Sequence, residues 1–162
     1  MRKLDFNEYK TCQIVARIFE KSIDLSNQSS PIFIRRFLTY DGTKCFFDKT
    51  YLYLSCNEND IINEINEKYE SDSKNVMYSK EEMYWIGYVY TAICYLYNLN
   101  SKAIYKKIPA KEIVKYYRIY HTFDIEEASE RMMENIGYEN LDYRSWGVKI
   151  LKDLAKKQKL EN

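Results

Sequence analysis

The sequence predicts an all-α protein in which two small helical halves pack around a central aromatic helix. Its 162 residues contain only 4 glycines and 2 prolines, the residues that most often break helices or form turns. Lys, Glu, Ile and Tyr are abundant, which favours helices over a turn-rich β sandwich. Three segments, starting at Asp5, Ser79 and Asp124, begin like a capping box, in which the first side chain and a Glu three residues later satisfy backbone amides.

The first half, residues 1–70, is predicted to hold three helices. Apolar side chains after Asp5 follow the 3.6-residue period of a helix, and Pro31 suits the first turn of the next one. The third helix is capped by Ser55, Asn57 or Asn59. In order, we expect helices over residues 5–23 and 32–38, a turn at 41–42, a segment at 46–54 that suits a strand or a short helix equally, and an acidic helix over 60–69.

The second half, residues 76–137, follows a polar and charged stretch at 70–75 that is typical of a linker. Gly137 is well placed to end its last helix. The two halves resemble each other weakly, which indicates either a tandem duplication or ordinary helix-turn-helix recurrence. The expected elements are helices over 79–98, 101–108, 109–120 and 124–136, and then a tail over 138–162 with an aromatic patch and a basic amphipathic stretch.

The central helix is the most distinctive segment, because residues 83–97 are apolar or aromatic on all sides and include five of the 17 tyrosines. Such a helix lies in a core or presents one stripe to a partner. The stripe through Met83 and Tyr90 is predicted to be core, whereas the one through Tyr84, Tyr88 and Tyr95 suits either role. Gly87 predicts a close crossing with another helix. The segment is too short and too polar to span a membrane.

Catalytic patterns are sparse. The glycines are isolated, so there is no phosphate-binding loop, and the four cysteines have no zinc spacing, so we expect reduced thiols in a cytoplasmic protein. The charged N-terminus predicts no signal peptide. The single histidine, His121, either acts as a general base or sets the turn before a helix, which is the favoured interpretation. We expect no enzyme activity, cofactor or metal.

Charge is segregated although the chain has 25 basic and 24 acidic side chains. Residues 102–118 carry a net charge of +5, residues 124–142 a net −6, residues 58–72 a net −5 and residues 147–162 a net +3. This pattern indicates either solvated faces or a surface that steers a charged partner. A DNA-binding role would use the mostly lysine cations of the first block, which suit phosphate contact more than base reading: Lys102, Lys106, Lys107, Lys111, Lys115 and Arg118.

Residues 79–134 resemble a family of small antitoxin-like proteins of low-GC bacteria, which are encoded beside toxins of ADP-ribosyltransferase fold. The matching motifs are Glu82-Met-Tyr84-Trp85-Ile-Gly87-Tyr88-Val-Tyr90, Ser101-Lys-x-Ile104-Tyr105-Lys-x-Ile108, Tyr120-His121-Thr122-x-Asp124 and Ala128-x-Glu130-Arg131-Met132. The first half is similar more loosely, and the tail after Gly147 lies outside the match. The resemblance implies an antitoxin role. It transfers no catalytic residue, because none is established in the family.

We therefore expect a non-enzymatic protein that binds and neutralises a protein toxin through an aromatic and charged surface. Aromatic anchors with flanking charge are typical of such interfaces. Two alternatives stay open: a nucleotide-binding protein with a tyrosine-lined cleft, and a DNA-binding regulator of its own operon. The candidate partner-binding residues are Tyr84, Trp85, Tyr88, Tyr95, Tyr105, His121, Trp146, Lys149, Lys152 and Lys156.

Overall fold

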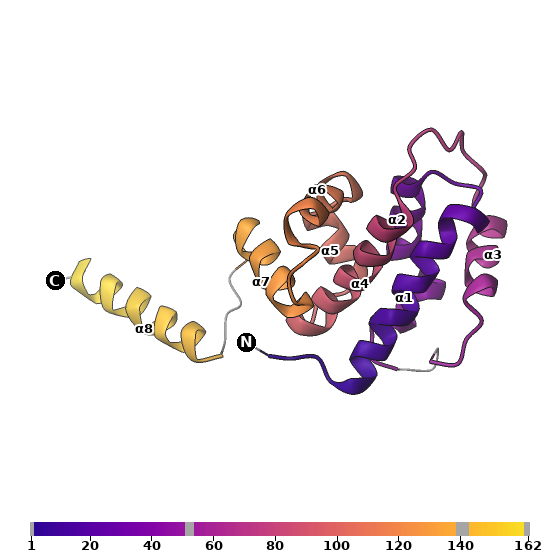
Figure 1. The fold of residues 1–162 in the computed structure, drawn as a ribbon. Coiled ribbons are helices and arrows are strands. Elements are labelled where there is room, and N and C mark those ends of the chain that lie inside the picture. The colour runs from indigo at the N-terminus through magenta and orange to yellow at the C-terminus, as the bar shows by residue number, and fades with distance from the viewer. Residues whose placement is uncertain (1, 51–53, 139–142, 161–162) are drawn as a thin grey trace. The chain divides into compact units, whose positions relative to one another are not determined.

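The computed structural model describes residues 2–50, 54–138 and 143–160, and within the last helix it describes the side chains of 150–158. These residues form eight α-helices and one 3₁₀ helix and contain no strand, which confirms the all-α prediction (Figure 1). They fall into two compact units, Met1–Met132 and Met133–Asn162. Among the described helices, none combines the length and the hydropathy that crossing a membrane requires.

Two long helices, α1 (Phe6–Leu25) and α4 (Lys80–Tyr97), form the centre of the first unit. Both begin with the predicted capping box. The Asp5 side chain accepts from the Glu8 amide at 2.9 Å, and Glu8 accepts from the Asp5 amide at 2.9 Å. Ser79 and Glu82 exchange the same pair of bonds at 3.1 and 2.8 Å. Each box satisfies amides that the first helical turn would leave without a partner.

Gly87 lies where α1 and α4 cross, as its position within an apolar helix predicted. A Cβ atom at this residue would lie 2.8 Å from Phe19 Cγ and 3.0 Å from the Val15 carbonyl oxygen. Only glycine lets the two backbones approach this closely. On either side of the crossing, Met83, Ile86 and Tyr90 are fully buried, so this stripe of α4 is core.

Phenylalanine rings fill the space between α1, α2 (Ser30–Thr39) and the 3₁₀ helix η1 (Asp41–Phe46). Phe37 is at the centre, with ring centroids 5.0 Å from Phe19, 5.9 Å from Phe33 and 5.9 Å from Phe46. Pro31 stands in the first turn of α2, as predicted. The 3₁₀ helix replaces the simple turn expected at 41–42, and residues 51–53 of the ambiguous segment lie outside the described part of the chain.

The stretch at 70–75 is predicted to be a linker between two halves. In the structure it belongs to the first unit, and hydrogen bonds join it to other segments of that unit. It follows α3 (Glu58–Lys68), whose N-cap is Asn57. Asp72 accepts hydrogen bonds from the Ser29 amide at 2.7 Å and the Ser29 hydroxyl at 2.8 Å. Lys74 Nζ donates to the Ser26 carbonyl at 2.8 Å. These bonds are long-range side-chain contacts, so a polar composition alone did not reveal them.

The first unit is completed by α5 (Ser101–Lys107), α6 (Ala110–Tyr120) and most of α7 (Ile125–Asn135). Contacts join α5 and α6 to α2 and α4. Tyr90 on α4 donates to the Ile108 carbonyl at 2.6 Å, which fixes the segment between α5 and α6. The second unit begins within α7, where Gly137 has a φ of +70° and the Tyr138 amide donates to the Met133 carbonyl at 2.9 Å, the expected helix ending. It continues with α8 (Tyr143–Leu160).

All four cysteines are free thiols. Cys12 and Cys94 are buried, and burial raises the pKa of both thiols. Cys45 and Cys56 are half-buried.

Candidate functional site

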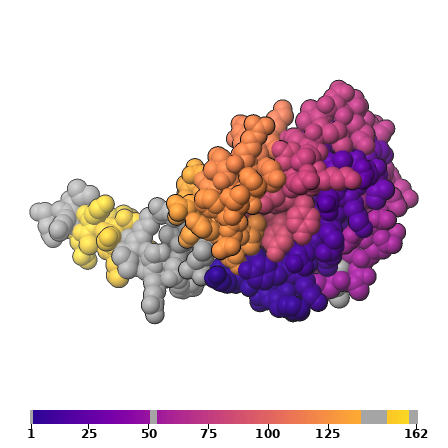
Figure 2. Space-filling view, viewed as in Figure 1, coloured from indigo at the N-terminus to yellow at the C-terminus, as the bar shows by residue number. Residues whose placement is uncertain are grey.

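The helix α6 packs against α2 and α4. Ala110 and Ile113 are its buried residues, and Pro109 stands at its N-cap. Tyr117 packs edge-on against Trp85 of α4, with ring centroids 5.7 Å apart. The other sides of α6 and the turn that follows it are half-buried or exposed, on a flank of the first unit that Figure 2 shows in orange.

An apolar row runs along α6 and into the turn after it; Tyr116 and Tyr120 are half-buried, and Ile119 and Phe123 are exposed. Tyr116, Ile119 and Tyr120 share one face of α6 by their i, i+3 and i+4 spacing, and Phe123 follows in the turn after the helix. The rings of Tyr116 and Tyr120 are stacked with centroids 5.9 Å apart, and Phe123 meets Tyr120 edge-on at 5.4 Å. Ile119 is 58% exposed and Phe123 is 39% exposed. Aliphatic and aromatic side chains this exposed and this close together mark an interaction surface more often than isolated ones do.

A basic row runs beside the apolar row and consists of Lys111, Lys115 and Arg118. All three side chains are exposed. Lys115 Nζ pairs with Glu112 at 2.8 Å on the same helix, whereas no ion pair among the described residues holds Lys111 or Arg118. A surface pair of this kind is weak, because water screens it. The three cations therefore present positive charge to solvent. We call the apolar and basic rows together the α6 face.

His121 belongs to the end of α6 and the turn after it. Its Nδ1 atom lies 2.9 Å from the Tyr117 carbonyl oxygen, and its ring stacks on Tyr117 with centroids 4.7 Å apart. The side chain is exposed. His121 therefore caps the C-terminus of α6 and lies in the turn after it. The favoured interpretation from the sequence, that it sets the turn before the next helix, describes a similar structural role.

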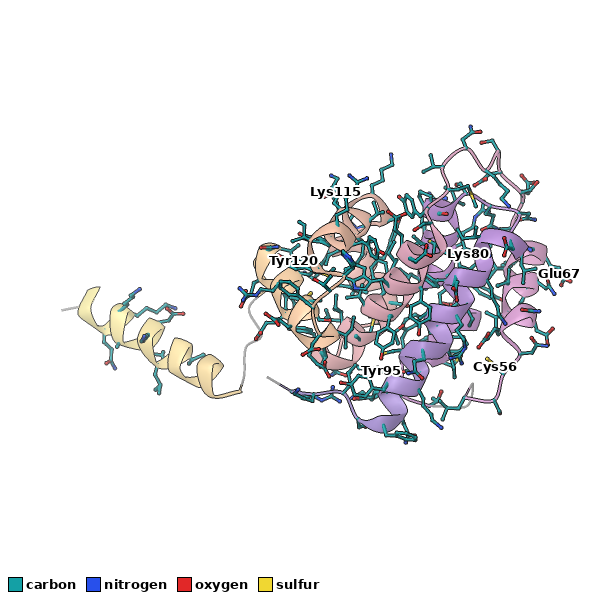
Figure 3. All side chains as sticks on the ribbon, viewed as in Figure 1. Cys56, Glu67, Lys80, Tyr95, Lys115 and Tyr120 are labelled. Carbon is teal, nitrogen blue, oxygen red and sulfur yellow. The ribbon has the colours of Figure 1, made fainter. Side chains whose placement is uncertain are left out.

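The predicted tyrosine stripe of α4 is mostly interior. Tyr95 is 2% exposed and donates to the Phe46 carbonyl, and Trp85 is 9% exposed against α6. Neither offers a surface to a partner. Tyr84 and Tyr88 are half-buried, with ring centroids 6.3 Å apart, and burial raises the pKa of Tyr88. Figure 3 labels Tyr95 beside α1, whereas Tyr120 and Lys115 lie on α6.

The other predicted residues are dispersed. Tyr105 is half-buried on α5, and Lys152 and Lys156 are exposed on α8 in the second unit. The side chains of Trp146 and Lys149 lie outside the described residues. Among the described residues, His121 and Trp85 both contact Tyr117 of α6, which is not part of the α6 face.

The residues that carry the α6 face were missed as a set. In the sequence, the cations of α6 suit DNA contact and the tyrosines of α4 suit protein contact. The helix was predicted to end at Tyr120, as it does in the structure, so Phe123 in the following turn was not grouped with Tyr116 and Tyr120.

Two buried carboxylates hold the N-terminal segment in place. Glu8 is 1% exposed and pairs with Arg2 at 2.5 Å. Glu126 at the start of α7 accepts from the Tyr9 hydroxyl and from the Leu4 amide. Burial opposes ionisation of Glu126, but these hydrogen bonds outweigh it and hold its pKa below the ordinary value. The bond to Glu126 also raises the pKa of Tyr9 to about 12.

An open hollow of about 550 Å³ lies between the end of α1 and the end of α3. Asn66 holds its edge by accepting from the Asn27 amide at 3.1 Å and donating to the Leu25 carbonyl at 2.9 Å. One tyrosine and none of the predicted site residues line it: the lining is Asn27, Asn66, Glu67, Lys68, Tyr69, Glu70 and Ser71. It is not the tyrosine-lined cleft that nucleotide binding would need. Within the described residues, no cluster of His, Cys, Asp or Glu could hold a metal ion.

No protein-family model, curated protein or solved structure matches this chain. The antitoxin resemblance of residues 79–134 therefore stays a prediction from the motifs.

Proposed function

We propose that this chain is a non-enzymatic binding protein that uses the α6 face to capture an acidic protein, and that this partner is a toxin of ADP-ribosyltransferase type encoded beside it. The observation that carries the binding proposal is the apolar row, in which Ile119 and Phe123 are exposed and the two tyrosines are half-buried, with a basic row alongside. The toxin's identity comes from the motif resemblance alone.

The composition of the α6 face supports protein recognition. Tyr and Arg are enriched among the residues that contribute most to binding free energy, and aromatic rings provide a large contact area at little cost in side-chain entropy. Tyr116 and Tyr120 are already stacked on each other, so their positions are partly fixed before a partner arrives. This preorganisation lowers the entropic cost of binding.

The charge of the α6 face supports an acidic partner. Lys111, Lys115 and Arg118 face solvent with a single acid, Glu112, among them. Complementary charge raises the association rate and selects among partners. The affinity for the partner is therefore expected to weaken as the salt concentration rises. Part of the affinity should remain at high salt, because salt does not screen the contacts of the apolar row.

Co-expression with the neighbouring toxin tests the proposal. We expect the chain to restore growth of cells that express the toxin, and the two purified proteins to co-elute as one complex in size-exclusion chromatography. The proposal fails if the pair neither co-elutes nor restores growth, or if no such toxin gene adjoins this one.

A second candidate is binding to single-stranded nucleic acid, because exposed cations beside stacked tyrosines also suit bases and phosphates. The near-neutral total charge argues against it. Fluorescence anisotropy with labelled single-stranded DNA and RNA at rising salt separates the two, since this candidate requires strongly salt-dependent binding.

A further inference from the structure

The turn between α6 and α7 consists of exposed residues, 121–124. Within it the Phe123 amide donates to the Tyr120 carbonyl at 3.0 Å, and at its far end the Ala128 amide donates to the Asp124 carbonyl at 2.8 Å. A turn that is this exposed gains little from the burial of its own side chains. Its course, and with it the position of Phe123 on the α6 face, therefore depends on how the two flanking helices are fixed.

The first turn of α7 is anchored to the N-terminal segment, residues 2–5. Glu126 is 4% exposed, and its Oε1 atom accepts from the Leu4 amide at 3.4 Å. The same oxygen accepts from the Tyr9 hydroxyl at the start of α1. Next to Glu126 in the chain, Ile125 packs against the apolar cluster to which Leu4 belongs. One polar and one apolar residue of α7 therefore attach it to the same segment.

The N-terminal segment is itself held at both ends. Arg2 donates to the Tyr95 carbonyl of α4 at 3.3 Å. At the other end Asp5 caps α1 through its two bonds with Glu8. Between these ends Leu4 is 5% exposed and lies in the core. The segment therefore ties the start of α7 to both central helices of the first unit.

We infer that Glu126 is a positioning residue of the α6 face. Its bonds to Leu4 and Tyr9 fix the first turn of α7, and the turn that leads into α7 then holds Phe123 in the orientation that a partner meets. Supporting hydrogen bonds of this kind preorganise a binding surface and lower the entropic cost of association. This inference rests on the proposed function, because the partner is the same neighbouring toxin.

The test compares Glu126→Ala with Glu127→Ala. Both variants lose one negative charge from the first turn of α7, but the Glu127 side chain is 45% exposed and pairs with Arg131 at 3.7 Å on the same helix. A third variant, Tyr9→Phe, removes one donor to Glu126 and changes no charge. Isothermal titration calorimetry measures toxin affinity at a temperature at which circular dichroism shows every variant to be folded, so that a loss of stability alone does not lower it. Hydrogen–deuterium exchange of the free chain reports on the Phe123 amide.

We expect Glu126→Ala to weaken toxin binding roughly two- to thirtyfold, the range for residues that act on a binding site without touching the ligand. Tyr9→Phe should weaken it less. Exchange within residues 121–124 should be faster in both variants, because local opening of the turn becomes easier. Glu127→Ala should match the wild type in both measurements.

Four results would overturn the inference. Wild-type affinity in Glu126→Ala, despite faster exchange, refutes the positioning role and leaves the proposed function intact. Equal weakening by Glu127→Ala assigns the effect to charge instead of position. Unchanged exchange in Glu126→Ala means that its bonds do not fix the turn. A wild type that does not bind the toxin refutes the proposed function, and this inference together with it.

Discussion

Replacing Gly87 with alanine tests the crossing of α1 and α4 on which the first unit is built. By helix propensity alone, alanine would be more stable than glycine by about 1 kcal/mol. In this structure the new Cβ would lie 2.8 Å from Phe19 Cγ and 3.0 Å from the Val15 carbonyl oxygen. The second contact is to backbone, so a side-chain rotation cannot relieve it. Overpacking of this kind costs roughly 1–3 kcal/mol.

The two terms leave a net loss of up to about 2 kcal/mol in the free energy of unfolding. At about 2–4 °C per kcal/mol, Tm should fall by up to roughly 4–8 °C. Urea unfolding followed by circular dichroism measures the change. The double variant Gly87→Ala/Phe19→Leu is expected to recover part of the loss, because the smaller side chain gives way. A Gly87→Ala variant more stable than the wild type would refute a close crossing.

Three further predictions concern polar groups of the first unit. Tyr90→Phe leaves a buried carbonyl without its donor and should lower the free energy of unfolding by about 1–3 kcal/mol in urea titrations; a change below about 0.5 kcal/mol would contradict the bond. Glu126 has a pKa below its ordinary value of 4.5, so its stabilisation is complete above that pH and is lost as the pH falls through the lowered pKa. The Glu126→Gln variant should therefore show a smaller fall in Tm at acid pH than the wild type, and Tyr9→Phe should show part of that effect. A Tm profile that is the same in all three proteins would contradict a stabilising role of ionised Glu126. Asp72→Ala removes two bonds to Ser29 and should speed proteolysis within residues 70–75, with intact-mass spectrometry as the readout; an unchanged cleavage rate would show that these bonds do not restrain the loop.

Much of the fold was predictable because its signals are local. The capping boxes that begin at Asp5 and Ser79 are each written in four consecutive residues, and both formed as predicted. Gly87 was informative for a different reason. A glycine within an apolar helix has no local advantage, so its presence pointed to a neighbouring backbone.

The remaining features depend on contacts between distant residues. Residues 70–75 are polar, as a linker would be, yet Asp72 and Lys74 bond to residues more than forty positions earlier. The tyrosines of α4 could be core or interface by composition. The choice depends on how α1 and η1 pack against α4, and in the structure this packing buries Tyr95. The apolar row of α6 was missed because it continues past the end of the helix at Tyr120 into the turn that holds Phe123.

The most direct test of the account compares toxin binding by two double variants with similar chemistry. Ile119→Ser/Phe123→Ser alters the apolar row of the α6 face, and Leu25→Ser/Phe6→Ser alters an aliphatic and an aromatic residue that are also exposed, but lie on α1. By isothermal titration calorimetry we expect at least about 30-fold weaker binding for the first variant, typical of losing two anchors, and wild-type affinity for the second. Equal affinities of the two variants would contradict a binding role for the α6 face.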